Sequence, residues 1–290
     1  MSKQGKMEAV GGGTQRMNMT EMIRSRRSVR TFDGKALREE DAAGILAFAD
    51  KVENPYELPI EWKLLDRKRD NLTIPVITGT DTYIAGKMRR APHAEEAFGY
   101  TFEKVVLYAQ SLGVGTTWIA GTMDRKAFEH AMRLSDAEVM PCVSPLGYPA
   151  EKMSLRETMM RKGVKADSRL DFEKLFFDGA FDKPLLAENA GELQPALELV
   201  RLAPSAVNGQ PWRVVRCGDR VHFYEKRGRG MASGTWDIQK IDMGIALCHF
   251  ELGAVESGLC PVLYVEDPGL PGQDGLIYIA SFKIKKMQDL

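Results

Sequence analysis

The sequence predicts a chain of intermixed helices and strands, built as two related halves that pack about a pseudo-twofold axis. The order helix, strand, strand, long helix occurs twice along the chain, with little literal identity. Matched residues recur about 145–150 positions apart: Phe32 and Phe181, Pro55 and Pro204, Trp62 and Trp212, Gly99 and Gly244, Gly113 and Gly258. Such an ordered set indicates a fused dimer within one chain.

The elements are expected in the following order. Residues 1–18 form a flexible leader, 19–175 the first half and 176–290 the second. Thr20 can cap a first helix that leads into a basic segment. The first half then contains, by hydrophobic periodicity, a helix at Glu39–Val52, strands at Glu61–Leu65 and Ile74–Thr78, helices at Glu95–Leu112 and Arg125–Met132, and a buried strand at Glu138–Gly147.

The second half begins after a polar stretch, Lys152–Lys174, which is expected to be a long irregular excursion over the surface. A helix that carries Leu193, Ala196, Leu197 and Val200 follows, and then a strand that opens at Trp212. Gly113 and Gly258 are well placed to end the long helix of each half.

The composition excludes several classes of protein. The 290 residues include 40 Lys+Arg and 40 Asp+Glu, and 44% of them are hydrophobic. A net charge of +0 argues against a protein that coats nucleic acid, and the hydrophobic content excludes a largely disordered chain. No run is apolar enough for a membrane span or a secretory signal, so we expect a cytoplasmic protein. The cysteines lack the spacing of a metal site, so we expect no metal and free thiols at Cys142, Cys217, Cys248 and Cys260.

A basic segment near the N-terminus can bind phosphate. Arg26, Arg27, Ser28 and Arg30 place three guanidiniums and a hydroxyl within five residues. Guanidinium groups donate bidentate hydrogen bonds to phosphate oxygens, so the segment suits one or two phosphates. The same residues also suit a solvated helix end whose cations complement the helix dipole, and the segment alone favours that interpretation.

A rigid polar loop occupies Ala203–Trp212. Two prolines restrict its backbone, and Ser205, Asn208 and Gln210 supply groups that both donate and accept hydrogen bonds. Such a loop can bind the mixed edge of a heterocycle such as a pyrimidine or isoalloxazine. It can equally be a helix-to-strand connection whose side chains bond their own backbone. The chain has no G-x-S-x-G, Walker A or H-E-x-x-H motif, so an enzyme built on it would rely on a cofactor.

Four segments together resemble the FMN-dependent nitroreductase family over about residues 20–290: Arg26–Phe32, Ala203–Trp212, Gly113–Gly121 and Pro145–Pro149. The resemblance implies an α+β sandwich of helices around a mixed β-sheet. Ordinary members form homodimers with FMN at the interface, and their first two segments lie close together in sequence. Here one repeat length separates them. One chain would therefore assemble one FMN site from both halves, as in the tandem subfamily, and the pseudo-symmetric site would be lost.

The resemblance also assigns contacts by position. It places the FMN phosphate against Arg26, Arg27, Ser28, Arg30, Arg169 and, as a weaker partner, Lys165. It places the flavin ring against Ala120, Gly121, Pro204, Ser205, Ala206 and Asn208. The backbone N–H of Gly121 would face flavin N5. Ala120 stands where the family carries an acidic residue, and Ala206 where many members carry a second serine, so Ala206 offers only backbone.

The implied activity is hydride transfer from NAD(P)H through FMN to a nitroaromatic, quinone or similar small acceptor. Two other interpretations stay open at this stage. One is a flavin-binding or regulatory module with the same fold and no turnover. The other is a nucleic-acid-binding protein that uses Arg24–Arg30 and Lys226–Arg229, against which the zero net charge counts. A fused dimer needs no partner, so we expect a monomer.

Overall fold

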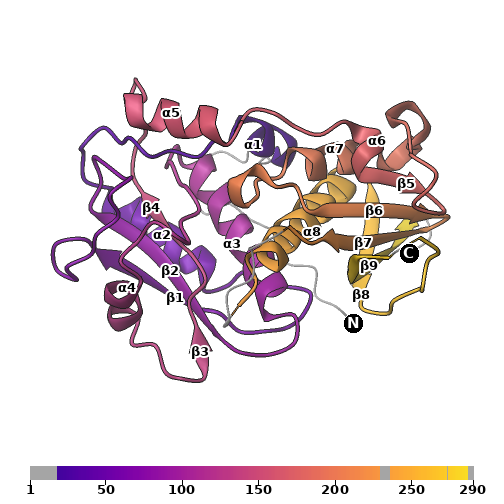
Figure 1. Cartoon of the computed structure of the whole chain (residues 1–290). Helices are drawn as coiled ribbons and strands as arrows, with labels where there is room; N and C mark the ends of the chain where they lie inside the picture. Colours follow the sequence, from indigo (N-terminus) through magenta and orange to yellow (C-terminus); the bar gives the residue numbers. More distant parts are fainter. Residues whose placement is uncertain (1–17, 229–235, 273, 287–290) are drawn as a thin grey trace.

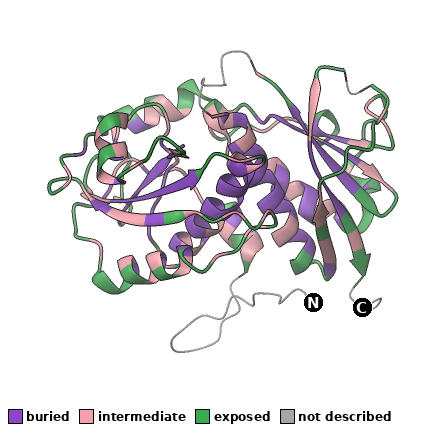
Figure 2. Ribbon diagram, turned by 90° about the horizontal axis from the view of Figure 1, so that it is seen from below, coloured by how far each residue is buried: buried purple, intermediate pink, exposed green. Residues whose placement is uncertain are grey.

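Two long helices form the centre of the molecule. The structure is a computed structural model, and it describes residues 18–228, 236–272 and 274–286. Helices α3 (Ala94–Ser111) and α8 (Ile238–Glu256) lie side by side, with one β-sheet beyond each of them (Figure 1). Buried residues concentrate on these two helices and on the facing strands (Figure 2). The predicted α+β sandwich of two related halves is confirmed, and each half has its own sheet. The predicted leader falls, up to Met17, outside the described residues.

The first sheet is antiparallel and comes from the first half. It contains β1 (Glu61–Asp66), β2 (Thr82–Arg89), β3 (Glu138–Val139) and β4 (Val143–Leu146), and β2 pairs with the other three. The second sheet is mixed, in the order β5-β6-β7-β9-β8. It contains β5 (Phe176–Asp178), β6 (Trp212–Cys217), β7 (Arg220–Lys226), β8 (Leu259–Tyr264) and β9 (Leu276–Lys286), with β5 parallel to β6.

Shorter helices surround this core. They are α1 (Met19–Ser25), α2 (Glu39–Ala49), α4 (Arg125–Ala131), α5 (Leu155–Gly163), α6 (Phe172–Leu175) and α7 (Gln194–Leu202), with single 3₁₀ turns at Ala187–Asn189, Gly191–Leu193 and Ala206–Asn208. The amphipathic pattern predicted α7 correctly, because Ala196, Leu197 and Val200 are among its buried residues, although Leu193 lies just before the helix.

The contact between α3 and α8 confirms the pseudo-twofold relation. A Cβ atom added to Gly99 would lie 2.1 Å from the carbonyl oxygen of Ile241, and one added to Gly244 would lie 2.1 Å from that of Glu96. The spacing in sequence between Gly99 and Gly244 equals that between Glu96 and Ile241. Each helix therefore makes the same contact with the other, as expected of a twofold interface. The helix backbones therefore approach so closely that only glycine fits at the crossing. Gly113 (φ +73°) and Gly258 (φ +80°) follow the two helices in left-handed conformations, as predicted.

Some local predictions were wrong. Ile74–Thr78 forms no strand, because the chain turns at Pro75, which lacks a backbone donor. The strand of this region is β2, whose near-continuous burial hides the alternation typical of a half-exposed strand. The predicted strand at Glu138–Gly147 is interrupted between β3 and β4, where Pro141 lies. Asn18, and not Thr20, caps α1, since its Oδ1 accepts from Glu21 N at 3.1 Å.

The polar stretch Lys152–Lys174 is also more ordered than predicted, since it contains α5 and α6. Ser154 caps α5 by accepting a hydrogen bond from the backbone N–H of Glu157 at 3.1 Å. Ser followed three residues later by Glu is a recognised helix-start pattern, so the sequence did carry a signal for this helix.

Candidate functional site

Three of the four segments named above meet in the first half. Ser28 pairs with Thr116 in a parallel bridge, and Val29 N donates to Thr116 O at 2.8 Å. Phe32 pairs with Pro149 in an antiparallel bridge. These backbone bonds hold the basic segment between the glycine segment at 113–121 and the segment at 145–149.

Four guanidinium groups gather beside this junction. They belong to Arg26, Arg30, Arg161 and Arg169. Arg26 follows α1 directly and its side chain is only 7% exposed. Burial lowers the pKa of Arg26, Arg30 and Arg169 below its ordinary value, and the charge of Arg161 lowers each of the three further. The cluster is thus a desolvated, mutually repelling set of cations, which an anion would stabilise.

The cluster also contains buried donors with no partner. Within the described residues, Nη1 of Arg26 and Nε of both Arg30 and Arg169 are buried without a hydrogen-bond partner. Leaving a buried N–H unpaired is costly, and more so when the group is charged. The nearest carboxylates only partly compensate, since Glu103 Oε1 lies 3.9 Å from Arg26 Nε. A ligand with several anionic oxygens, such as a phosphate monoester, fits this donor set.

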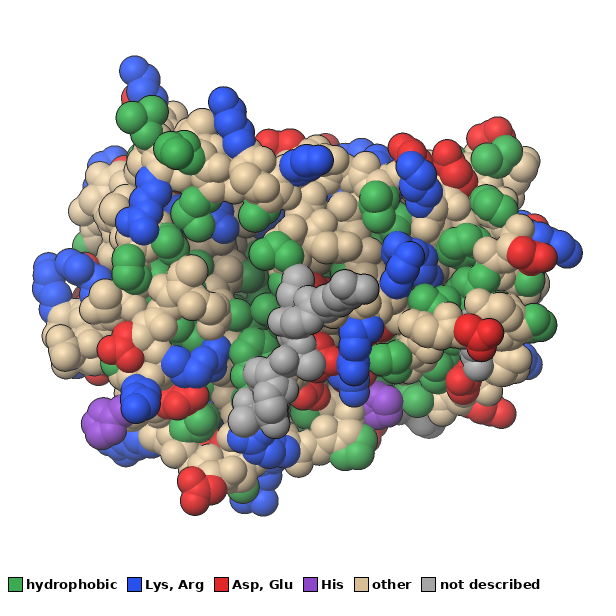
Figure 3. Space-filling view, in the orientation of Figure 1, with side chains coloured by type: hydrophobic (Ala, Val, Ile, Leu, Met, Phe, Trp, Pro, Cys, Tyr) green, Lys and Arg blue, Asp and Glu red, His purple; other side chains and the backbone are tan. Residues whose placement is uncertain are grey.

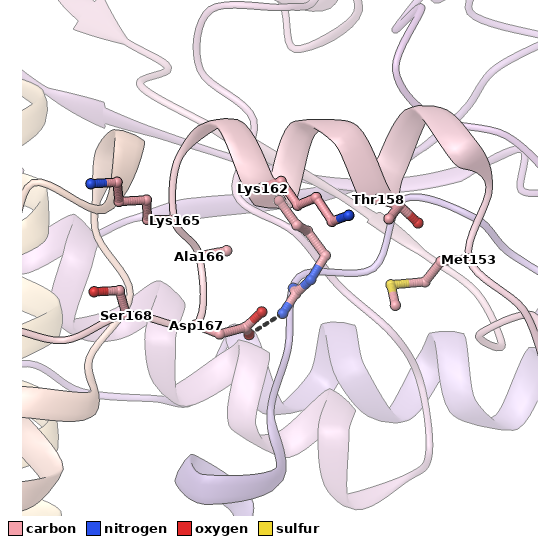
Figure 4. A pocket seen from close by; sticks show the side chains of 8 residues that line it. Met153, Thr158, Lys162, Lys165, Ala166, Asp167 and Ser168 are labelled. Carbon is pink, nitrogen blue, oxygen red and sulfur yellow. Dashed lines mark hydrogen bonds and ion pairs between the residues drawn. The ribbon is translucent and has the colours of Figure 1, made fainter.

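A cavity of about 260 Å³ opens between α5 and the turn that follows it (Figure 4). The ion pair between Arg161 and Asp167 borders the cavity. Lys165 and Ser168 lie on the side opposite Met153. Lys and Arg side chains mix with exposed hydrophobic ones over α5 (Figure 3). The remaining lining residues are Met153, Thr158, Lys162 and Ala166.

The polar loop of the second half adopts a conformation that most residues avoid. Val207 (φ 48°), Asn208 (φ 58°) and Gln210 (φ 48°) all lie in the left-handed region, although none is glycine. Two hydrogen bonds fix this shape. Gln210 N donates to Ser205 Oγ at 2.9 Å, and Leu170 N donates to Gln210 Oε1 at 2.9 Å.

Asn208 and Arg169 join this loop to the cation cluster. Arg169 Nη1 donates to Asn208 Oδ1 at 3.3 Å. The Asn208 amide in turn donates to the carbonyls of Lys165, at 2.8 Å, and Ser168, at 3.0 Å. Asn208 therefore fastens the loop to the segment at 165–169, and both of its amide hydrogens are used. Its predicted contact with the ring edge remains a prediction.

A buried carboxyl group, that of Asp242, binds the backbone of the polar loop. The backbone N–H of Ala206 donates to both oxygens of Asp242, at 3.0 and 3.1 Å. Asp242 lies in the first turns of α8, and burial raises the pKa of its carboxyl well above the ordinary value. The resemblance predicts that the backbone of Ala206 contacts the flavin ring. In the structure its N–H is instead bound to Asp242.

Ala120 and Gly121, which the resemblance places against the flavin ring, differ in their surroundings. Gly121 is exposed, and a Cβ atom added to it would meet no atom within 4 Å. The Ala120 carbonyl is instead engaged, since it accepts a hydrogen bond from Arg125 Nη2 at 2.8 Å. The peptide between them is therefore anchored through its oxygen, next to an exposed glycine.

Not every predicted residue joins the cluster. Arg27 is 38% exposed and its Nη1 lies 3.5 Å from Glu157 Oε1. Lys165 is exposed, and the structure places its carbonyl, not its ammonium, in contact with the polar loop. Ser28 is fixed mainly by its backbone bridge, and Pro204 is partly buried at the start of the loop.

A second buried network, close to Arg26 of the cluster, links the two halves. Glu103 of α3 accepts from Trp118 Nε1 at 3.2 Å, and its Oε1 lies 2.9 Å from Nε2 of His249 on α8. The other ring nitrogen of His249 lies 2.9 Å from Leu199 O. Glu103 thereby lies near Arg26 and joins the two central helices. Sequence reasoning missed Glu103, Arg161, Asp242 and His249 as members of these networks.

The chain is similar to known proteins along most of its length. Residues 18–254 match the family model described as "Putative TM nitroreductase". The chain belongs to this nitroreductase family. A crystal structure of a "putative nitroreductase" from Thermotoga maritima is 20% identical, has a TM-score of 0.61, and aligns over 96% of this chain and 98% of its own. That likeness shows a shared fold over the whole chain.

Single nitroreductase units match only half of this nitroreductase-family chain. A nitroreductase family protein from Clostridium novyi NT is 19% identical and covers 47% of this chain and 87% of its own, with a TM-score of 0.40. An FMN-dependent nitroreductase from Clostridium difficile R20291 is 18% identical and covers 46% and 88%, with a TM-score of 0.41. No curated protein sequence matches the chain.

The described part of the chain also bears on membrane-spanning helices, metal-type clusters and the basic loop of the second half. None of its helices is both long and apolar enough to cross a membrane. Within the same residues, no three His, Cys, Asp or Glu side chains gather as a metal ion would require. Arg227, one cation of the alternative nucleic-acid-binding interpretation, pairs with Glu225 at 3.2 Å and with Asp237 at 2.6 Å. Arg229, another of its cations, lies outside the described residues.

Proposed function

We propose that this nitroreductase-family protein is an FMN-dependent oxidoreductase. It would take hydride from NAD(P)H and reduce a nitroaromatic, quinone or similar small acceptor. The observation that carries the proposal is the direct link between Arg169, in the cluster of buried arginines, and Asn208, in the polar loop of the second half. If the arginines bind a phosphate and the loop binds a heterocycle, this link supports the proposal, because a flavin mononucleotide needs the two sites next to each other.

The residues present fit FMN. The unpartnered buried donors of Arg26, Arg30 and Arg169 would hold the phosphate, with Arg161 as a further cation. When bound, FMN would supply the capacity to accept a hydride and to pass electrons on. The Gly121 N–H, whose peptide is anchored through the Ala120 carbonyl, would donate a hydrogen bond where negative charge develops on the ring. The protein thus positions and stabilises, and needs no acid or base of its own.

We further propose one site per chain and a monomeric protein. The first-half counterpart of the polar loop folds on itself, because Asn54 Oδ1 accepts from Tyr56 N at 3.1 Å and Asn54 Nδ2 donates to Leu58 O at 2.8 Å. That loop has no Ser-x-x-Asn pattern to offer a second ring. Light scattering that gives the mass of one chain, 32.4 kDa, would support the monomer, and twice that mass would refute it.

The proposed activity is tested with purified protein loaded with FMN. Oxidation of NADH or NADPH is followed at 340 nm, with and without menadione or nitrofurazone, and with the FMN-free protein as control. Acceptor-dependent oxidation that requires FMN is the expected result. Bound FMN with no oxidation of either cofactor would favour the flavin-binding module without turnover.

Gly121→Ala tests the placement of the ring. Because the added methyl meets no protein atom and Gly121 has an ordinary φ, the variant should unfold at the wild-type temperature. A ring lying against this peptide would collide with the methyl, so FMN affinity should fall by about tenfold or more. Calorimetry and fluorescence titration measure the two effects. Unchanged affinity would place the ring elsewhere.

A further inference from the structure

Arg125 makes an unusual set of contacts beside the Ala120–Gly121 peptide. It is the first residue of α4, and its guanidinium donates to three backbone carbonyls from two segments. Nη2 donates to Ala120 O at 2.8 Å and to Pro141 O at 3.1 Å, and Nη1 donates to Met140 O at 2.7 Å. A rigid planar fork is needed to satisfy these acceptors together, and lysine cannot provide one.

The same guanidinium also contacts the other half of the molecule. Its Cζ atom lies 5.3 Å from the centre of the Trp236 ring, which precedes α8. This distance is within the range of a cation–π interaction. Glu129, one turn further along α4, adds a carboxylate 3.8 Å from Nη1. Arg125 and Trp236 both line a cavity of about 720 Å³, so a ligand can approach this contact.

The contact with Ala120 has a consequence for Gly121. The Ala120 carbonyl and the Gly121 N–H belong to one planar peptide group, so fixing the oxygen also fixes the direction of the N–H. A charged donor on the carbonyl polarises the peptide and strengthens its N–H as a donor. Within the described residues, no other side chain donates a hydrogen bond to this carbonyl.

We propose that Arg125 is a positioning residue for the proposed flavin reaction. It aims and strengthens the Gly121 N–H, and Trp236 of the second half holds Arg125 in place. The inference rests on the proposed function, because it concerns the group that the N–H would meet. It adds a residue outside the segments that resemble the family signatures, and it makes the flavin chemistry depend on a contact between the halves.

The test compares Arg125→Gln, Arg125→Lys and the wild type, each loaded with FMN. Three quantities are measured: the FMN dissociation constant, the reduction potential of bound FMN, and the rate constant of its anaerobic reduction by NADH in a single turnover. Arg125→Gln should keep the dissociation constant, shift the potential to more negative values and lower the rate constant by about tenfold or more. For Arg125→Lys, the potential and the rate constant should lie between those of the wild type and of Arg125→Gln, because lysine retains the charge without the planar guanidinium.

Two further variants keep the test decisive if Arg125→Gln folds poorly. Trp236→Ala should shift the potential in the same direction, and Trp236→Phe should restore it, since phenylalanine retains an aromatic face. Arg216→Gln is the matched control, because Arg216 also donates to a backbone carbonyl, that of Asn189 at 2.9 Å, but lies in the second sheet. A wild type that binds no FMN would refute the proposed function itself. FMN binding with unchanged potential and rate in Arg125→Gln and Trp236→Ala would overturn only the role of Arg125.

Discussion

Gly244→Ala is expected to destabilise the protein by about 3 kcal/mol or more. The new methyl would lie 2.1 Å from the carbonyl oxygen of Glu96 and 2.8 Å from the backbone nitrogen of Tyr100. These are backbone atoms of the facing helix, so no side chain can rotate away, and α3 and α8 must separate. Because the two helices join the halves, the whole core is affected. Denaturant unfolding followed by circular dichroism measures the loss, and Gly99→Ala should behave similarly.

Gly44→Ala is the matched control for this prediction. Gly44 also lies within a helix, α2, but a methyl there would meet only the Tyr108 hydroxyl oxygen, at an ordinary 3.5 Å. Since alanine is favoured over glycine in helices by about 1 kcal/mol, this variant should be as stable as the wild type or more so. If Gly244→Ala and Gly44→Ala had the same stability, the close crossing of α3 and α8 would be wrong.

Arg26→Ala and Asn208→Ala are each expected to weaken FMN binding by about 10–100-fold. The two residues come from opposite halves. Arg26→Ala removes a buried cation with an unpartnered donor from the proposed phosphate site. Asn208→Ala removes the hydrogen bonds that the amide makes with Lys165 O, Ser168 O and Arg169, and so releases the loop from the cluster.

Isothermal titration with FMN measures both losses, and Arg216→Ala is the control. Arg216 pairs with Asp178 in the second sheet, so its loss should leave the affinity unchanged. Normal FMN affinity in both Arg26→Ala and Asn208→Ala would refute the site. If FMN affinity fell in only one of the two variants, a single half of the chain would carry the binding.

Local patterns in the sequence predicted the main frame of the fold. The helix α3 has a strong apolar periodicity and a glycine just beyond its end, and the repeated glycines of α3 and α8 pointed to the two halves. Strand β2 was missed because both its faces are buried. Its Gly86 admits the Trp62 ring, which would lie 2.5 Å from an added Cβ, and no local pattern reveals such a contact.

The candidate site was only partly predictable, because many of its contacts join segments that are distant in sequence. Helix α5 was missed because its hydrophobic residues do not mark its buried face: Leu155 and Met159 are 85% and 72% exposed, whereas its buried residue is Glu157. Arg161, which lies on α5, was missed with it. Glu103 and His249 pair across 146 residues, and the Ala206–Asp242 contact likewise joins distant segments. Tertiary packing alone brings such groups together.

The stoichiometry of FMN binding tests the central claim most directly, which is that each chain forms one composite flavin site. Purified protein is saturated with FMN, freed of unbound flavin and measured by its absorbance spectrum against protein concentration. We expect about one FMN per chain, since the arginine cluster occurs in the first half and the polar loop in the second. No binding at excess FMN would contradict the proposed site, and two FMN per chain would contradict the loss of the pseudo-symmetric one.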